Sequence, residues 1–260
     1  MADYTFLDLV APGIAERNHG EGFNEIFGNP LLNATGTVTI NHVVMAGVVT
    51  VLIVILGLIA RRKYASKEEA MIPDGKLTVR NFFEVIFDAT LGLMTEMMGK
   101  ENAKKFFPLI GALAVFILLS NLLGLIPGFL PPTQNLNTNL ACSAVVFVVY
   151  NVAGLREHGM GYLKHFLGPI WFIAPLMLVI ELIGHAFRPI SLAVRLTGNM
   201  TGDHMVLGVF GDLAAGLVQV PALLPVPFLF LGLLVSIIQT LVFCLLSSIY
   251  ISLAVSHEGH

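Results

Sequence analysis

The sequence contains few charged residues. Only 12% of its 260 residues are Asp, Glu, Lys or Arg, whereas 56% are hydrophobic, and the mean hydropathy is +0.83. A soluble globular domain carries about 25% charged residues. The two cysteines, Cys142 and Cys244, both lie inside apolar runs, so neither a disulfide framework nor a cysteine metal site is indicated. The composition excludes a soluble domain and indicates an integral membrane protein.

The sequence also lacks the period-two alternation of a transmembrane β-barrel. A helix needs about 20 residues to cross a bilayer core of ~30 Å, and the apolar runs of this sequence are close to that length. The run lengths therefore predict an all-α fold. No GxxxxGK[ST] loop is present, so we expect no nucleotide-phosphate site. Residues 1–37 are acidic and lack the basic start and short apolar core of a signal peptide, which predicts a retained N-terminal segment.

Basic residues cluster in a few joints and predict an orientation. The first apolar run, 42–60, ends on "RRK", so by the positive-inside rule this end is cytoplasmic and residues 1–37 lie outside. Residues 76–105 interleave lysines and arginine with apolar side chains, which is typical of an amphipathic helix on the cytoplasmic surface. An ordinary soluble connector is the alternative for this segment.

The remaining apolar sequence allows two arrangements. Spans are predicted at 107–126 and 140–155, but no lysine follows Lys164, so loop charge gives no orientation beyond it. Hydropathy permits either three or four further crossings or two long tilted helices, 163–210 and 227–254. The first of these would be about 70 Å long. Either way, residues 38–260 are expected to form one membrane domain, and the arrangement with two long helices gives it about five embedded helices and a cytoplasmic C-terminus.

One face of the segment after 163 carries small and charged residues. With alternating spacings of three and four, the stripe consists of Glu181, Gly184, Arg188, Ser191, Arg195, Gly198 and Gly202. His185, Asn199 and Asp203 flank it, and His204 points roughly opposite to Arg195. Small residues allow another helix to approach closely, and charges must face protein or water. We expect the partner within this chain to be the last helix, whose own polar and small stripe is Gly232, Ser236, Gln239, Thr240, Ser247 and Tyr250.

Arg195 requires a counter-charge. Placing it near the bilayer centre costs ~2.5–3.5 kcal/mol on insertion scales, and a guanidinium does not escape the cost by losing its proton. Along a helix Glu181 is about 21 Å away and Asp203 about 12 Å, so we expect the counter-charge on another polypeptide. Glu181, on the cytoplasmic side, and Asp203 and His204, on the outer side, would then be two proton-accessible zones separated by a fixed positive charge.

The segment "RLTGNMTGDH" resembles the signature around the essential arginine of subunit a of F-type ATP synthases, with Arg195 at the arginine position and Asn199 four residues later. Similarity extends through "SNLLGLIP", which contains Asn121, and "PPTQNLNTNLA" to "SIIQTLVFCLLSSIYISLA", where Gln239 matches the glutamine that faces the arginine. The resemblance implies a long tilted helical hairpin, residues 163–254, beside a ring of subunit c with a carboxylate on each ring subunit.

The resemblance also implies roles for individual residues. The outer half-channel would use Asn199, Asp203, His204 and Gln239, and the cytoplasmic one Glu181, Arg188, Ser191 and Tyr250, with His185 and Asn121 as further candidates. The sequence departs from many family members, which have Glu at the position of His204, His at that of Gly232 and Gly at that of Asp203.

The resemblance predicts a non-catalytic subunit that couples proton translocation to ring rotation and ATP synthesis in a bacterial inner membrane. The expected partners are the subunit c ring, the peripheral-stalk subunit b, other ATP synthase subunits and membrane lipid. We expect no nucleic acid, no cofactor and no metal. A secondary cation/proton transporter is the alternative, although no inverted repeat is evident. A haem-carrying anchor that uses His42, His185 or His204 is a third reading.

Overall fold

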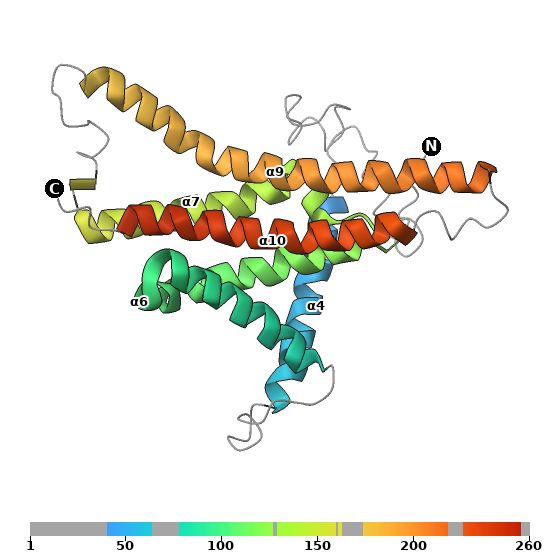
Figure 1. Ribbon diagram of the computed structural model, residues 1–260. Helices are drawn as coiled ribbons and strands as arrows, with labels where there is room; N and C mark the ends of the chain where they lie inside the picture. The colour runs from blue at the N-terminus through green and yellow to red at the C-terminus, as the bar shows by residue number, and fades with distance from the viewer. Residues whose placement is uncertain are drawn as a thin grey trace, which may run out of the picture.

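The computed structural model describes residues 41–63, 78–126, 129–159, 161–162, 174–217 and 226–255. In these ranges the chain forms the long helices α4 (Asn41–Lys63), α6 (Val79–Gly124), α7 (Leu136–His158), α9 (Ala174–Leu217) and α10 (Val226–Val255), with the short 3-10 helix η1 (Pro132–Gln134) (Figure 1). These five long helices are each long and apolar enough to cross a membrane. The prediction of an all-α, multi-pass membrane protein is confirmed, while the predicted outer segment 1–37 lies outside the described residues.

Helix α6 corrects one predicted boundary. It begins after Thr78, whose side-chain oxygen accepts a hydrogen bond from the backbone N–H of Asn81 as an N-cap. Its only break is at Gly99, where φ is 78° and ψ is 163°, a conformation that favours glycine. The predicted surface helix 76–105 therefore ends at residue 98, and residues 100–105 already belong to the second half. The polar run 100–105 (KENAKK) follows the break directly, so the polar residues that the prediction placed at the end of the surface helix begin the second half of α6.

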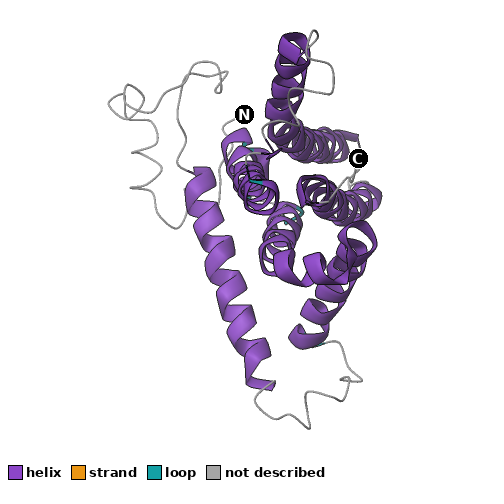
Figure 2. Ribbon diagram, turned by 90° about the vertical axis from the view of Figure 1, so that its left-hand side faces the viewer, coloured by secondary structure: helices purple, strands orange, loops and turns teal. Residues whose placement is uncertain are grey.

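The two halves of α6, residues 79–98 and 100–124, form a V (Figure 1). Helix α4, which confirms the predicted first span, crosses near the open side of this V and contacts α6. Figure 2 looks nearly along the other long helices, and α4 stands at full length beside their bundle. Helix α7 confirms the predicted span 140–155 but begins four residues earlier, because Asn135 caps its first turn by accepting from the N–H of Asn137.

Helices α9 and α10 settle the question of further crossings. Helix α9 is continuous for 44 residues, about 66 Å, through Pro189 and through residues 211–216. The chain therefore forms two long helices instead of three or four short ones, and they run antiparallel beside each other (Figure 1). The described part of α9 begins at Ala174, so the predicted start at 163 lies outside the described residues. The ribbon curves away from α10 in the N-terminal half of α9, where Pro189 lacks a backbone donor.

The main core lies between α10 and the second half of α6. Ile110, Ala114 and Ile117 of α6 are fully buried with Phe243 and Ile251 of α10. The polar stripe of α10 is also buried except for the half-buried Tyr250. Three hydroxyl groups of α10, two of them in the stripe, donate to backbone carbonyls of the same helix: Ser236 to Gly232, Thr240 to Ser236 and Ser248 to Cys244. Hydroxyl groups satisfied within their own helix can pack against apolar side chains.

This packing corrects the expected partner of the α9 stripe. Helix α10 packs mainly against α6 and less against α9. A Cβ atom added at Gly184, Gly198 or Gly202 would meet no neighbouring atom within 4 Å. The expectation that α10 covers these glycines is therefore wrong. The buried face of α10 packs against the long apolar surface of α6. The glycine face of α9 has no neighbour in the described part of the chain.

Candidate functional site

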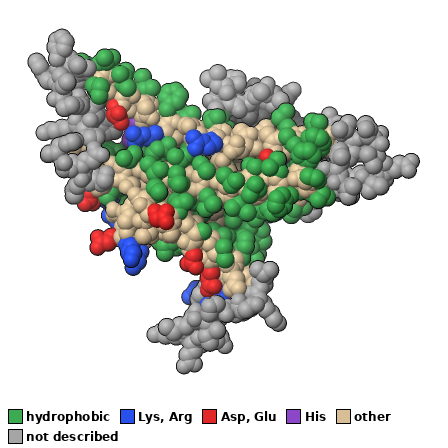
Figure 3. All heavy atoms as spheres, viewed as in Figure 1, with side chains coloured by type: hydrophobic (Ala, Val, Ile, Leu, Met, Phe, Trp, Pro, Cys, Tyr) green, Lys and Arg blue, Asp and Glu red, His purple; other side chains and the backbone are tan. Residues whose placement is uncertain are grey.

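Arg195 lies on the open face of α9. It is exposed, as are Ser191, Gly198 and Gly202 on the same stripe, whereas Leu192 and Leu196 on the other side of the helix are buried. Within the described residues Arg195 forms no ion pair and no hydrogen bond. In Figure 3 one of the two basic patches over α9 lies near an acidic side chain, and the other has no acidic side chain beside it. The helix thus presents a fixed positive charge in an apolar surrounding, with space around it.

One turn after Arg195, Asn199 connects α9 to α10. Its Nδ2 donates a hydrogen bond of 2.6 Å to Oε1 of Gln239, which is buried. The second polar atom of this amide, Nε2 of Gln239, has no partner in the described part of the chain. Gln239 thus hydrogen-bonds the neighbour of Arg195 and makes no hydrogen bond to Arg195 itself. The Asn199–Gln239 pair borders the arginine face on the side toward the C-terminal end of α9.

His204 packs away from the arginine face, against the end of α6. An ideal Cβ on Gly124 would lie 2.9 Å from Nε2 of His204 and 2.6 Å from Cε of Met200, so only glycine permits this approach. His204 Nε2 is buried without a hydrogen-bond partner among the described residues. Asp203, half-buried, makes no ion pair there. The opposite directions of Arg195 and His204 agree with the helical arithmetic.

Gly232 marks a position where many family members have histidine. Here Cδ2 of Leu125 would lie 2.7 Å from a Cβ atom at residue 232. The space is thus filled from the end of α6, and the structure leaves no room for a larger side chain without moving Leu125. The titratable residues of α9 on this side of Arg195 are then Asp203, His204 and Asp212.

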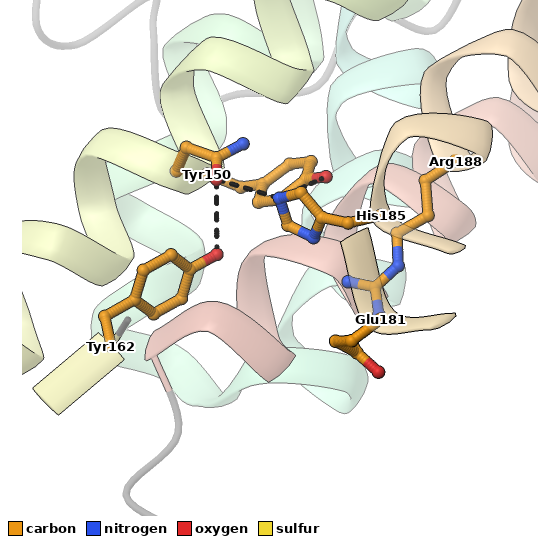
Figure 4. Close-up of polar contacts among 6 residues, drawn as sticks. Tyr150, Tyr162, Glu181, His185 and Arg188 are labelled. Carbon is orange, nitrogen blue, oxygen red and sulfur yellow. Dashed lines mark hydrogen bonds and ion pairs between the residues drawn. The ribbon is translucent and has the colours of Figure 1, made fainter. Parts of the chain in front are cut away.

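A second polar zone lies about 10–21 Å along α9 in the other direction. There Nη2 of Arg188 lies 3.6 Å from Oε1 of Glu181, and the two side chains point toward each other (Figure 4). The guanidinium carbon of Arg188 is also 5.6 Å from the ring centre of Tyr250 on α10. The structure brings together three of the four residues that the resemblance assigned to the cytoplasmic half-channel. Ser191 is exposed and remains apart from them.

His185 joins α9 to α7 next to this zone. It is only 6% exposed, and its Nε2 lies 2.8 Å from Oδ1 of Asn151 and 3.3 Å from the hydroxyl of Tyr150 (Figure 4). The hydroxyl of Tyr162, beyond the end of α7, donates to the same Asn151 oxygen at 3.4 Å. Burial raises the pKa of the Tyr162 phenol, so the hydroxyl group keeps its proton and donates this hydrogen bond.

Sequence reasoning singled out His185 but missed Tyr150, Asn151 and Tyr162. The available signal was the dipeptide "YN" at 150–151, a polar pair inside an apolar run. A polar group inside a predicted span faces protein or water, so the pair could have been expected to meet a partner. Which partner it meets depends on how α7 lies against α9, and this is not encoded in local spacing.

Asn121 belongs to a separate buried network. Its Oδ1 accepts a 2.7 Å hydrogen bond from the hydroxyl of Thr133 in η1. Asn139, on α7, donates from Nδ2 to the carbonyl of Thr133 at 2.6 Å and to the hydroxyl of Thr197 at 2.7 Å. These bonds hold η1 between α6, α7 and α9. The structure places Asn121 in this structural network and not beside Arg195.

The network gives a stability prediction. We expect Asn139→Ala to lower the free energy of unfolding by about 1–3 kcal/mol, because the buried carbonyl of Thr133 loses its donor. Asn137→Ala is the matched control, since no hydrogen bond of the Asn137 side chain is found among the described residues, and it should change stability by less than about 0.5 kcal/mol. Reversible unfolding of the purified chain in mixed micelles measures both. Equal effects of the two variants would contradict the role given to Asn139.

Comparison with known proteins is consistent with this arrangement. A family model described as ATP synthase A chain matches residues 43–252. The ATP synthase subunit a of Sorangium cellulosum (strain So ce56) is 43% identical over 258 residues, covering 98% of this chain and 96% of the relative. That of Trichlorobacter lovleyi is 51% identical over 211 residues, covering 81% and 85%. That of Geobacter sulfurreducens is 50% identical over 187 residues, covering 72% and 77%. The chain, with its long α9–α10 hairpin and exposed Arg195, therefore belongs to the ATP synthase subunit a family.

Proposed function

We propose that this chain is the stator subunit that offers two proton half-channels to a rotating ring of subunit c, with Arg195 between them. Membership of the family makes it a subunit of the ATP synthase complex in a bacterial membrane. The observation that carries the finer proposal is the open face of α9. Arg195 stands there exposed, beside glycines that no atom of the described chain covers and without an acidic partner among the described residues.

The charge of Arg195 controls the protonation of the moving carboxyl group. A carboxyl group opposite a guanidinium is held in its ionised form, because the neighbouring positive charge lowers the free energy of the carboxylate. The ring carboxyl therefore releases its proton before it passes Arg195 and takes up another after it. Protons that enter and leave on different sides turn the ring in one direction, driven by ~2.3 kcal/mol per charge per 100 mV.

The two polar zones supply the two paths. On the outer side, Asn199 and Gln239 border the arginine, and Asp203 and His204 are the groups that exchange protons. On the cytoplasmic side, Glu181 exchanges protons, with Arg188, Tyr250 and the His185 cluster close to it and Ser191 farther along α9 toward Arg195. In this mechanism the subunit makes and breaks no covalent bond. Its N-terminus lies outside and its C-terminus in the cytoplasm, and the peripheral-stalk subunit b binds it from a side that the ring does not occupy.

A photo-cross-linking experiment tests the partner on the arginine face. We expect benzoylphenylalanine at Gly198 to cross-link a small two-helix proteolipid in intact membranes, because this position lies next to Arg195 with open space around it. Gly208 is the matched control: it also has no neighbour within 4 Å, but it lies ~220° round the helix from Arg195. The Gly198 product should exceed the Gly208 product about tenfold or more, measured by immunoblot and mass spectrometry. Equal products from both positions would refute the assignment of this face.

The other two readings are less well supported. The secondary transporter is not favoured by the family match, and it predicts ion exchange by the purified chain alone in liposomes, where we expect none. His185 and His204 are separated by about 28 Å along α9, so they cannot ligate one haem together.

A further inference from the structure

A cavity of about 390 Å³ lies where α4 crosses the V of α6. Ile53 and Gly57 line it from α4, Phe83 and Phe87 from the first half of α6, and Phe107 from the second half. Its volume is within the range of small-ligand sites, about 300–1,000 Å³. The cavity is far from the arginine face of α9 along the chain and has no part in the mechanism above.

The walls of the cavity are apolar and aromatic. The rings of Phe83 and Phe87 are 5.8 Å apart, and those of Phe87 and Phe107 are 5.5 Å apart in a T-shaped arrangement. Among the described residues that line it, the single charged side chain is Arg61, which is exposed near the end of α4. An apolar chamber with one cationic group at its edge fits a molecule with an apolar chain and an anionic head.

We propose that this cavity binds an acyl chain of an anionic membrane phospholipid, with the phosphate group at Arg61. A guanidinium presents a planar fork of donors that matches phosphate oxygens. Arg61 belongs to the "RRK" run that the positive-inside rule places at the cytoplasmic leaflet, where basic pockets between helices bind anionic head groups. The aromatic walls take the acyl chain.

Two observations favour a lipid over a helix of another subunit. The first is the cationic group of Arg61 at the edge of an otherwise apolar lining, which complements an anionic head group joined to an apolar chain. In addition, α4 is weakly packed: among its described side chains only Met45, Val49 and Ala60 are buried. A flexible acyl chain in the cavity completes the contact between α4 and α6 that protein atoms leave open.

The test uses the intact ATP synthase complex in phosphatidylcholine nanodiscs. A trace of phosphatidylglycerol with a diazirine at the end of one acyl chain is photolysed, and the labelled peptides are identified by mass spectrometry. We expect label on residues 83–87 and 107–115, about fivefold more than from the phosphatidylcholine probe. This factor corresponds to about 1 kcal/mol for one basic side chain at an anionic surface.

Two variants and one control separate the binding of the acyl chain from the binding of the phosphate head group. Gly57→Phe should fill the cavity and remove the label, because no atom lies within 4 Å of the added Cβ. Gly47→Phe, on the same helix with equally open space, lies outside the cavity and should leave the label unchanged. Arg61→Gln, at an exposed position that packing does not require, should equalise the two lipid probes without removing the acyl-chain label.

Three results would overturn the proposal. The first is equal labelling by both probes in the unaltered complex. The second is a failure of either variant to act as expected: label that persists in Gly57→Phe, or a preference for phosphatidylglycerol that persists in Arg61→Gln. The third is a polypeptide cross-linked to benzoylphenylalanine at Phe83 in place of lipid, which would assign the cavity to a neighbouring subunit.

Discussion

Arg195→Ala is expected to reduce ATP-driven proton pumping by a factor of roughly 100 or more. In the proposed mechanism the arginine is the counter-charge of a ring carboxylate in a water-poor interface. Removing one partner of a buried charge pair costs about 3–5 kcal/mol, which corresponds to at least two orders of magnitude in rate. Quenching of a pH-sensitive dye in inverted membrane vesicles measures pumping after addition of ATP.

The same substitution should make the membrane passively leaky to protons. Without the guanidinium a protonated ring carboxyl can pass α9, so protons cross without ATP turnover. Arg195→Lys keeps the charge but loses the planar fork of donors, and we expect an intermediate loss of pumping with little leak.

Arg156→Ala is the control for Arg195→Ala, because Arg156 is exposed near the end of α7 and away from the arginine face. It should pump normally. Normal pumping by Arg195→Ala, with the complex assembled to the same extent, would remove the basis of the proposed function.

Gly202→Leu is expected to stop rotation while the chain still folds. An added Cβ at residue 202 meets no atom of the described chain within 4 Å, so the isolated subunit accommodates the larger side chain. This residue lies ~20° from the direction of Arg195, where the ring would pass closely in the proposed mechanism. Overpacking a tight contact costs about 1–3 kcal/mol, and each ring subunit meets it in turn, so we expect coupled ATP synthesis to fall about tenfold or more.

Gly208→Leu provides the matched control for this glycine. Residue 208 has equally open space but faces away from Arg195, so the same substitution should leave ATP synthesis within about twofold of the unaltered complex. Assembly is measured by the amount of ring protein that copurifies. If both variants reduce synthesis equally, or if neither does, the glycine face has no special relation to the ring.

Hydropathy and charge predicted most of the fold because the bilayer constrains the chain strongly. The spans at α4 and α7 follow from the requirement for about 20 apolar residues, since backbone groups must be satisfied within each helix. The same requirement could not choose between short crossings and α9, because a tilted helix of 44 residues has the same composition as two upright ones. The break at Gly99 was missed because the polar run 100–105 that follows it was taken as the end of the surface helix, whereas it begins the second half of α6.

Local geometry predicted which way the site residues point but not what they meet. The period of 3.6 residues placed Arg195 and His204 on opposite sides of α9, and the structure has them there. The same argument could not find the Tyr150–His185 contact, because it depends on how α7 and α9 lie together. The same argument also predicted that α10 packs against the glycine face of α9, whereas α10 packs mainly against α6.

The hydroxyl groups buried between α10 and α6 have an electrical consequence. Ser236, Thr240 and Ser248 each donate their hydrogen to a carbonyl of their own helix, so these hydrogens are not available to a neighbouring acceptor. Proton hopping needs an unbroken chain of donors and acceptors, and of the buried hydroxyl groups on α10 only that of Ser247 is without a partner among the described residues. In the proposed mechanism, the three saturated hydroxyl groups would thus act as electrical insulation along α10, and the proton path would follow the surface that α10 shares with α9.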